Sequence, residues 1–102
     1  LIDIIKISNE ASNNGISISP HCWNSMSVSA SAMLHVCSSI SNSEKAEIFP
    51  DYINFSKKFC ELPFDIVDNK AHINKSAGLG IVIHEDILSQ LSIYSLDEKS
   101  ND

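Results

Sequence analysis

The chain has 102 residues, of which 43% are hydrophobic and 20% charged, and this composition indicates one small globular domain rather than a disordered segment. The formal net charge is −6, and phosphate backbones bind to clustered cations, so the charge argues against a nucleic-acid partner. No apolar run reaches the roughly 18 residues of a membrane span, so we expect no membrane contact and a cytoplasmic protein.

The first predicted unit is a helix followed by a short strand. Apolar residues recur at helical spacing over residues 1–14, and the Asn-Asn-Gly sequence at 13–15 supplies the left-handed conformation at which helices end. Residues 16–19 then alternate apolar and polar side chains, which predicts a strand. Pro20 cannot continue a hydrogen-bonded ladder, so we expect the strand to end there.

The second predicted unit repeats this order. Asn24 or Ser25 can cap a helix that we expect to end near residues 41–42. Residues 46–49 predict a second short strand, which again stops at a proline, Pro50. Helix, strand, helix, strand is the order of an α/β fold with a parallel sheet.

Two parallel strands are too few for a complete sheet, because parallel sheets need both faces buried. The missing strands must therefore come from elsewhere. The chain opens with Leu1 rather than Met, inside a helical pattern. We therefore expect an upstream segment of a longer protein to supply these strands, with a second copy of the chain as the alternative.

The second half of the chain predicts antiparallel structure. Residues 64–67 and 71–73 flank Asp-Asn-Lys at 68–70, which is good turn chemistry for a β-hairpin. A third apolar run covers residues 79–83, and a short helix is expected to begin with Glu85, an acid that suits the helix dipole.

The chain thus divides into three predicted regions. Residues 1–50 hold the last βα units of an incomplete α/β barrel, and residues 51–96 hold a C-terminal β extension with its short helix. Residues 97–102 are uniformly polar, and we expect them to form a mobile tail.

A histidine and a carboxylate are predicted to meet at one edge of this structure. Catalytic groups of α/β barrels lie at the C-terminal ends of strands, where side chains alternate between two faces. The alternation places His21 on the polar face where the first strand ends. In the second strand it turns Ala46 and Ile48 toward the helices, which leaves Glu47 on the face that matches that of His21. Such a pair can act as a base and a hydrogen-bonding acid. Most single histidines and glutamates near strand ends are only solvated or bound to backbone, so the spacing leaves that interpretation open.

Other chemically capable side chains have competing structural interpretations. Trp23 follows the histidine and can line a substrate pocket, although a tryptophan at a strand–helix junction more often packs into a local core. His35 falls within a predicted helix and is expected to be packed or partly exposed rather than a ligand. His72 and His84 have too few neighbouring ligands for a zinc site.

Four landmarks stand in order along the sequence. They are G-I-S-I-S-P-H-C-W at 15–23, the helix with Ala30, Ala32, Leu34 and His35, then Ala46-Glu47, and Gly78-Leu79-Gly80-Ile81 followed by Asp86. Together they resemble the C-terminal end of an enolase-superfamily barrel of the mandelate racemase and muconate lactonizing type. The likeness covers residues 1–96. The implied fold is α/β: a C-terminal fragment of a (β/α)-barrel, with its last two strands and their helices, followed by a β-hairpin extension.

The resemblance also implies a chemistry for two residues. His21 takes the position of the family's general base or acid, which moves a proton at the carbon next to a substrate carboxylate. Glu47 takes the position of the eighth-strand acid, which hydrogen-bonds that carboxylate as it becomes an enolate. The implied activity is that of a racemase, an epimerase or a dehydratase acting on a small-molecule carboxylate.

This chain also departs from the family pattern. The implied cofactor is Mg²⁺, but its carboxylate ligands lie on the third, fourth and fifth strands, which are absent here, so no residue is assigned to the metal. An aspartate usually orients the family histidine, and Asp3 lies too close to His21 in sequence to serve. Ala77 also stands where the family usually has proline.

These absences predict that the chain alone is inactive. We expect it to associate with the missing part of the barrel or with further copies of itself. The alternative is a truncated, non-catalytic remnant or assembly module that buries its barrel edge against another polypeptide.

Overall fold

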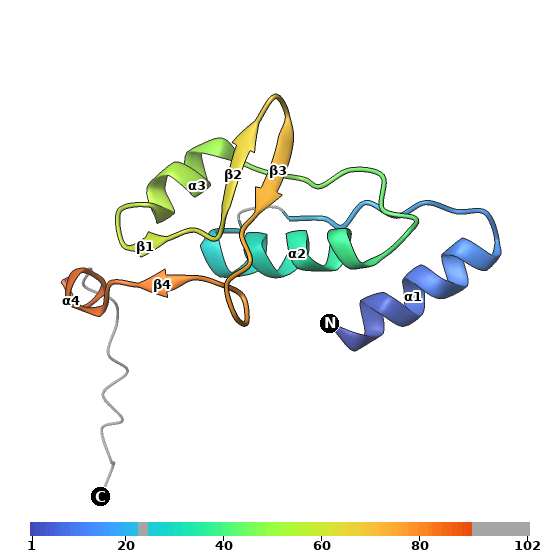
Figure 1. The fold of residues 1–102 in the computed structure, drawn as a ribbon, viewed down its shortest axis with the longest axis horizontal. Coiled ribbons are helices and arrows are strands. Elements are labelled where there is room, and N and C mark those ends of the chain that lie inside the picture. Colours follow the sequence, from blue (N-terminus) through green and yellow to red (C-terminus); the bar gives the residue numbers. More distant parts are fainter. Residues whose placement is uncertain (23–24, 91–102) are drawn as a thin grey trace, which may run out of the picture.

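The computed structural model describes residues 1–22 and 25–90, so Trp23 and the predicted tail at 97–102 lie outside the described residues. Helix α2 (Ser27–Ser39) runs through the middle of the molecule, with helix α1 (Ile2–Asn13) to one side of it (Figure 1). No helix in the described ranges is long and apolar enough to cross a bilayer.

Helix α1 forms where the apolar spacing predicted it. It ends at Asn14, and Gly15 follows with a φ of +69° and donates its N–H to the carbonyl of Ser12. The expected Asn-Asn-Gly stop is therefore confirmed. Ser8 is the buried residue of this helix, and its hydroxyl donates to the side chain of Asn42.

The two predicted strands of the first half are much shorter than expected. Among the described residues, Ile18 of the first predicted strand forms one isolated parallel bridge, and its partner is Ser43, which precedes the second predicted strand. The N–H of Ile18 donates to the Asn42 carbonyl at 2.9 Å, and its carbonyl accepts from the N–H of Glu44 at 3.0 Å. Residues 46–49 form no strand. The parallel direction was predicted correctly and the strand lengths were wrong, because a parallel pair without neighbours on both sides has little to hold it in register.

Helix α2 begins later than the sequence predicted. Its N-cap is Met26, whereas Asn24 or Ser25 was expected, and no side chain of the cap residue accepts a hydrogen bond. The hydroxyl of Ser56 instead accepts the N–H of Ser27 at 3.2 Å. A free N–H at the first turn of a helix needs an acceptor, and here a residue from another helix supplies it.

Helix α3 (Pro50–Ser56) was not predicted. The sequence suggested that Pro50 ends a strand, but proline is also favoured at the first position of a helix, where its missing N–H costs nothing. Asp51 lies in the first turn, where a negative charge suits the helix dipole. The helix buries Ile53 and Ser56.

The predicted hairpin is confirmed. Strand β2 (Phe64–Val67) pairs antiparallel with strand β3 (Lys70–Ile73), so that Phe64 faces Ile73 and Val67 faces Lys70. The two turn residues between the strands, Asp68 and Asn69, have φ values of +49° and +60°. Positive φ at both positions is the geometry of the turn that best matches the twist of a hairpin.

A second antiparallel pair joins residues that are far apart in sequence. Strand β1 (Cys60–Glu61), which was not predicted, pairs with β4 (Val82–Ile83), the end of the predicted third run. Helix α4 (Glu85–Leu88) follows as expected. The loop before β4 packs tightly at Gly80, which has a φ of +70° and where a Cβ would lie 2.7 Å from that of Pro63.

One hydrophobic core joins the two halves of the chain, including residues from both sides of residue 50. Helix α2 supplies much of it, and the extended segment 44–49 packs against it through Ala46 and Ile48. The fully buried members of the cluster are Cys22, Ala30, Met33, Leu34, Ile53 and Phe64. Because Cys22 and Ala46 belong to this packing, the core fixes the chain on either side of the two candidate catalytic residues.

Candidate functional site

The structure brings His21 and Glu47 together, as the sequence analysis expected. The Nδ1 atom of His21 lies 3.1 Å from Oε2 of Glu47. The same carboxylate oxygen accepts the backbone N–H of Cys22 at 2.6 Å. One oxygen of Glu47 therefore binds both the imidazole and the main chain of the next residue.

Strand alternation does not fully explain this contact. Ile18 and Ser43 lie opposite one another in the parallel bridge and share a face. Ser17 and Glu44, the next residues on the other face, also meet, since the Ser17 hydroxyl donates to Oε2 of Glu44 at 3.1 Å. Continued as a regular strand, this register would put Glu47 and His21 on opposite faces. The chain after Glu44 is not a regular strand, and the carboxylate of Glu47 reaches the backbone of Cys22 instead.

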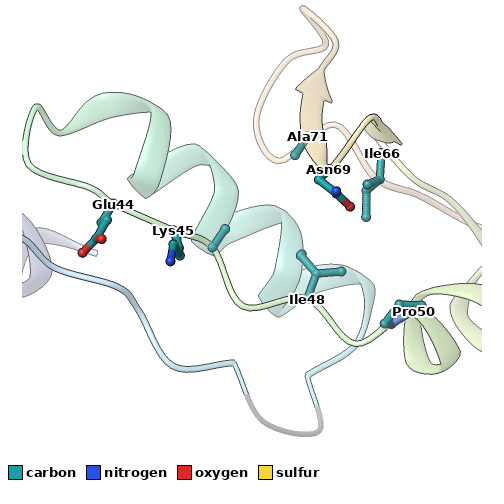
Figure 2. A pocket seen from close by; sticks show the side chains of 8 residues that line it. Glu44, Lys45, Ile48, Pro50, Ile66, Asn69 and Ala71 are labelled. Atoms are coloured by element: carbon teal, nitrogen blue, oxygen red, sulfur yellow. The ribbon is translucent and has the colours of Figure 1, made fainter.

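The packing of the neighbouring residues holds Glu47 in this position. Ala46 and Ile48 pack against the core, as the alternation predicted, so the side chains between them turn away from it. Figure 2 shows Ile48 pointing toward the hairpin side, and Lys45 pointing to the other side of the segment. The hydrophobic packing of Ala46 and Ile48 thus leaves the side chain of Glu47 free to contact the histidine.

The pair lies beside a solvent-filled hollow of about 390 Å³. The side chain of His21 is 77% exposed and that of Glu47 is 38% exposed, so solute molecules can reach both. Residues of the two extended segments line the hollow: Ser19, Pro20, His21, Lys45, Ala46 and Glu47.

The contact defines which nitrogen of His21 can react. A neutral imidazole has one N–H and one lone pair. With Nδ1 lying 3.1 Å from the carboxylate of Glu47, a proton on Nδ1 faces an acceptor and leaves the lone pair on Nε2. A carboxylate that accepts from the other ring nitrogen orients the ring. The arrangement can therefore take a proton from a carbon acid placed at Nε2 and return it.

A larger hollow, of about 570 Å³, lies between segment 44–50 and the hairpin (Figure 2). Its lining is Glu44, Lys45, Ala46, Ile48, Pro50, Ile66, Asn69 and Ala71. No local sequence pattern predicts this hollow, because it arises where the hairpin folds over a segment some 20 residues away in the chain. Lys45 and Ala46 line both hollows.

The remaining histidines do not join the site. His35 is half-buried in α2, in keeping with the packed role expected of it, and its Nε2 has no hydrogen-bond partner among the described residues. His72 is exposed on β3. Within residues 1–22 and 25–90, no three His, Cys, Asp or Glu side chains are grouped so that they could hold a metal ion. The residues of these two ranges therefore do not form a magnesium site, and none of them is assigned to a metal.

Comparisons with known proteins identify the family to which this chain belongs. A family model described as enolase C-terminal domain-like matches residues 1–87. A solved structure, described as the crystal structure of an enolase from the environmental genome shotgun sequencing of the Sargasso Sea, is 95% identical in sequence with a TM-score of 0.86. The match covers 91% of this chain and 25% of that one, so the chain spans a quarter of its length. No curated protein matches.

Proposed function

The chain belongs to the enolase C-terminal domain-like family, and from this premise we propose that it is the C-terminal portion of a racemase, epimerase or dehydratase. The proposed reaction removes the α-proton of a carboxylate substrate and passes through an enolate. His21 is the base, and its Nε2 takes the proton. The fold supports this reading, since the chain matches a quarter of an enolase structure.

The 3.1 Å contact between Nδ1 of His21 and Oε2 of Glu47 carries the proposal. It leaves the lone pair of the imidazole on the exposed nitrogen. It also favours a role for Glu47 that differs from the one implied by the family resemblance. An oxygen that accepts two N–H groups is suited to an ionised carboxylate that orients a histidine, and less to an acid that donates to the substrate. We therefore propose that Glu47 positions His21.

Further parts of the reaction lie outside this chain. Members of the enolase superfamily generally use Mg²⁺, and a bound metal of this kind supplies charge stabilisation to an enolate. We propose that residues elsewhere in the full-length protein hold it, and no step is assigned to it here. Three free cysteines, Cys22, Cys37 and Cys60, support a reducing location such as the cytoplasm.

The rate of α-proton exchange in deuterium oxide tests the proposal. In the full-length protein, with a panel of hydroxy, sugar and amino acids as substrates, His21→Ala is expected to lower the exchange rate by about 10²–10⁴-fold, the usual contribution of a general base. Glu47→Gln is expected to lower it by roughly 10–100-fold, through misorientation of the ring. His72→Ala, an exposed histidine on β3, is the matched control and should leave the rate unchanged.

The outcomes separate the two roles. Exchange that survives in His21→Ala removes the base from the proposal, whatever the effect at Glu47. Exchange lost in His21→Ala but intact in Glu47→Gln removes only the positioning role.

A second candidate function is a non-catalytic remnant or assembly module. The observation that favours it is the amount of apolar surface on the described residues. Exposed examples from α1, α2, the hairpin and β4 are Leu1, Ile2, Ile7, Val28, Ile66, Val67, Val82 and Ile83. Such surface is expected to drive association of the isolated 102-residue chain, with the rest of the barrel or with itself. A full-length protein that exchanges no α-proton on any carboxylate would favour this candidate, and a monomeric isolated chain in ultracentrifugation would count against it.

A further inference from the structure

A carboxylate substrate creates a problem of charge in the hollow beside His21. Glu47 accepts two N–H groups with one oxygen and thereby presents an anionic group at the wall of the hollow. A substrate carboxylate would bring a second negative charge to the same place, and like charges a few ångströms apart repel. The chain as a whole adds to this repulsion with its net charge of −6. A cation of this chain in the hollow would offset this repulsion, in addition to any metal held elsewhere in the full-length protein.

Lys45 is the lysine that lines this hollow. It precedes Glu47 by two positions, and both residues line the same hollow. Figure 2 shows the side chain of Lys45 on the opposite side of the segment from that of Ile48. The other lysines in the described ranges line neither this hollow nor the larger one. A cation at this position thus shares the hollow with the base and its partner.

The amino group of Lys45 is available to a ligand. The side chain is exposed, and within the described ranges no ion pair or hydrogen bond engages it. Its acidic neighbour in sequence, Glu44, accepts a hydrogen bond from Ser17. The long flexible stem of a lysine also lets the ammonium follow a ligand within the hollow.

We propose that Lys45 binds the carboxylate of the substrate. Its ammonium offsets the charge of Glu47 and holds the carboxylate so that the adjacent carbon faces Nε2 of His21. Lys45 is then a substrate-binding residue, and the class of ligand is a small organic acid with a free carboxylate. The reacting role of this ligand rests on the proposed function, whereas its binding does not.

Isothermal titration of the full-length protein with malonate tests the binding. Malonate carries two carboxylates, and malonamide serves as the uncharged analogue of the same shape. Both titrations are made in the presence of a chelator, so that a bound metal contributes nothing. Malonate is expected to bind the unaltered protein, and Lys45→Met should weaken that binding roughly tenfold to a hundredfold, as for the loss of one charge-assisted hydrogen bond.

Three further variants control the experiment. Lys45→Arg keeps the charge and should stay within about threefold of the unaltered protein. Lys70→Met removes an exposed lysine of β3 and should change nothing. Lys45→Gln replaces Lys45→Met should the latter fail to give a folded circular-dichroism spectrum. An unaltered protein that does not bind malonate, or equal affinities in Lys45→Met or Lys45→Gln and the unaltered protein, would overturn the inference.

The same variants separate this inference from the proposed function. If the protein exchanges α-protons and Lys45→Met leaves the apparent substrate affinity unchanged, the role of Lys45 is overturned and the proposed reaction is not. Malonate binding that depends on Lys45, in a protein that exchanges no α-proton, overturns the reaction and leaves the binding site standing.

Discussion

The two halves of this chain are held together by different means. The hairpin β2–β3 forms four antiparallel pairs across a two-residue turn. The extended segments before α2 and after it, by contrast, meet in one parallel bridge between Ile18 and Ser43. A hairpin brings its own partner within a few residues, whereas a parallel pair needs a helical crossover and further strands on both sides. Local turn chemistry is therefore enough for the second half and insufficient for the first.

The same contrast appears in helix α1. Its apolar residues Leu1 and Ile2 are about 70% exposed, and Ile7 is 58% exposed. The helix is tied to the rest of the molecule largely by polar contacts at Asn42, whose amide donates to the carbonyls of Ser8 and Ile16. Helix α1 has an apolar face, yet its contacts to the rest of the molecule depend largely on the side chain of Asn42.

The largest expected loss of stability is at Phe64, and it tests whether the hairpin in the second half is packed into the core. Phe64 is 4% exposed and belongs to the core cluster. Phe64→Ala in the full-length protein is expected to lower the free energy of unfolding by about 3–5 kcal/mol, measured by urea denaturation. Ile66→Ala, two residues along the same strand and 46% exposed, should cost less than about 1 kcal/mol. Equal effects at the two positions would contradict the core assignment.

Gly80 offers the next largest effect. Alanine there would adopt an unfavourable φ of +70° and place its Cβ against Pro63 and Ser76. We expect Gly80→Ala to lower the free energy of unfolding by more than about 2 kcal/mol. Gly78→Ala is the matched control, because its φ is +62° but nothing lies within 4 Å of the added carbon, and about 1 kcal/mol is expected. A control as damaging as Gly80→Ala would mean that φ alone sets the cost.

Asn42 tests the first half. Asn42→Ala removes the contacts to Ser8 and Ile16, and a loss of about 1–2 kcal/mol is expected locally. Hydrogen exchange should show faster amide exchange in α1 and no change in β2 and β3. Asn74→Ala, which removes a single exposed bond to the N–H of Ser76, is the control. Unchanged protection of α1 would show that its apolar face, and not Asn42, holds it.

The smallest effect is expected at the hairpin turn. Asn69→Gly relieves a positive φ of +60° and should stabilise the protein by roughly 0.5 kcal/mol, seen as a small rise in the urea midpoint. Asn69→Val should act in the opposite direction, by about 1 kcal/mol, because a β-branched side chain tolerates positive φ poorly. A valine variant as stable as the original would mean that the turn does not limit the hairpin.

What the sequence predicted well depends on residues close together in the chain. Helix α1 with its Gly15 stop, the hairpin around Asp68 and Asn69, and α4 after Glu85 all formed as expected. What it missed depends on distant partners. The cap at Ser27 comes from Ser56, and β1 pairs with a strand about 20 residues later. Pro50 is a local signal that fits both a strand end and a helix start, and only the packing of Ile53 decides between them.

The candidate site divides in the same way. The alternation in the sequence predicted that Ala46 and Ile48 pack against the core and that Glu47 does not, and the structure agrees. The hydrogen bond from the backbone N–H of Cys22 to Glu47 could not be predicted from the sequence, because no side-chain pattern indicates a main-chain donor. Trp23 remains a candidate for substrate binding, and it lies outside the described residues. The catalytic roles of His21 and Glu47 remain predictions that the exchange experiments will test.

The carboxylate of Glu47 contacts both the ring of His21 and the backbone N–H of Cys22, so one contact remains in a variant without the His21 side chain. Because the main chain of Cys22 holds the carboxylate, removal of the histidine ring does not release it. A His21→Gly variant would then keep an anchored acceptor beside an open slot at the surface. Free imidazole added to the buffer can occupy that slot and donate a hydrogen bond to the carboxylate oxygen of Glu47. We therefore expect imidazole to restore part of the α-proton exchange rate, with a dependence on imidazole concentration that saturates.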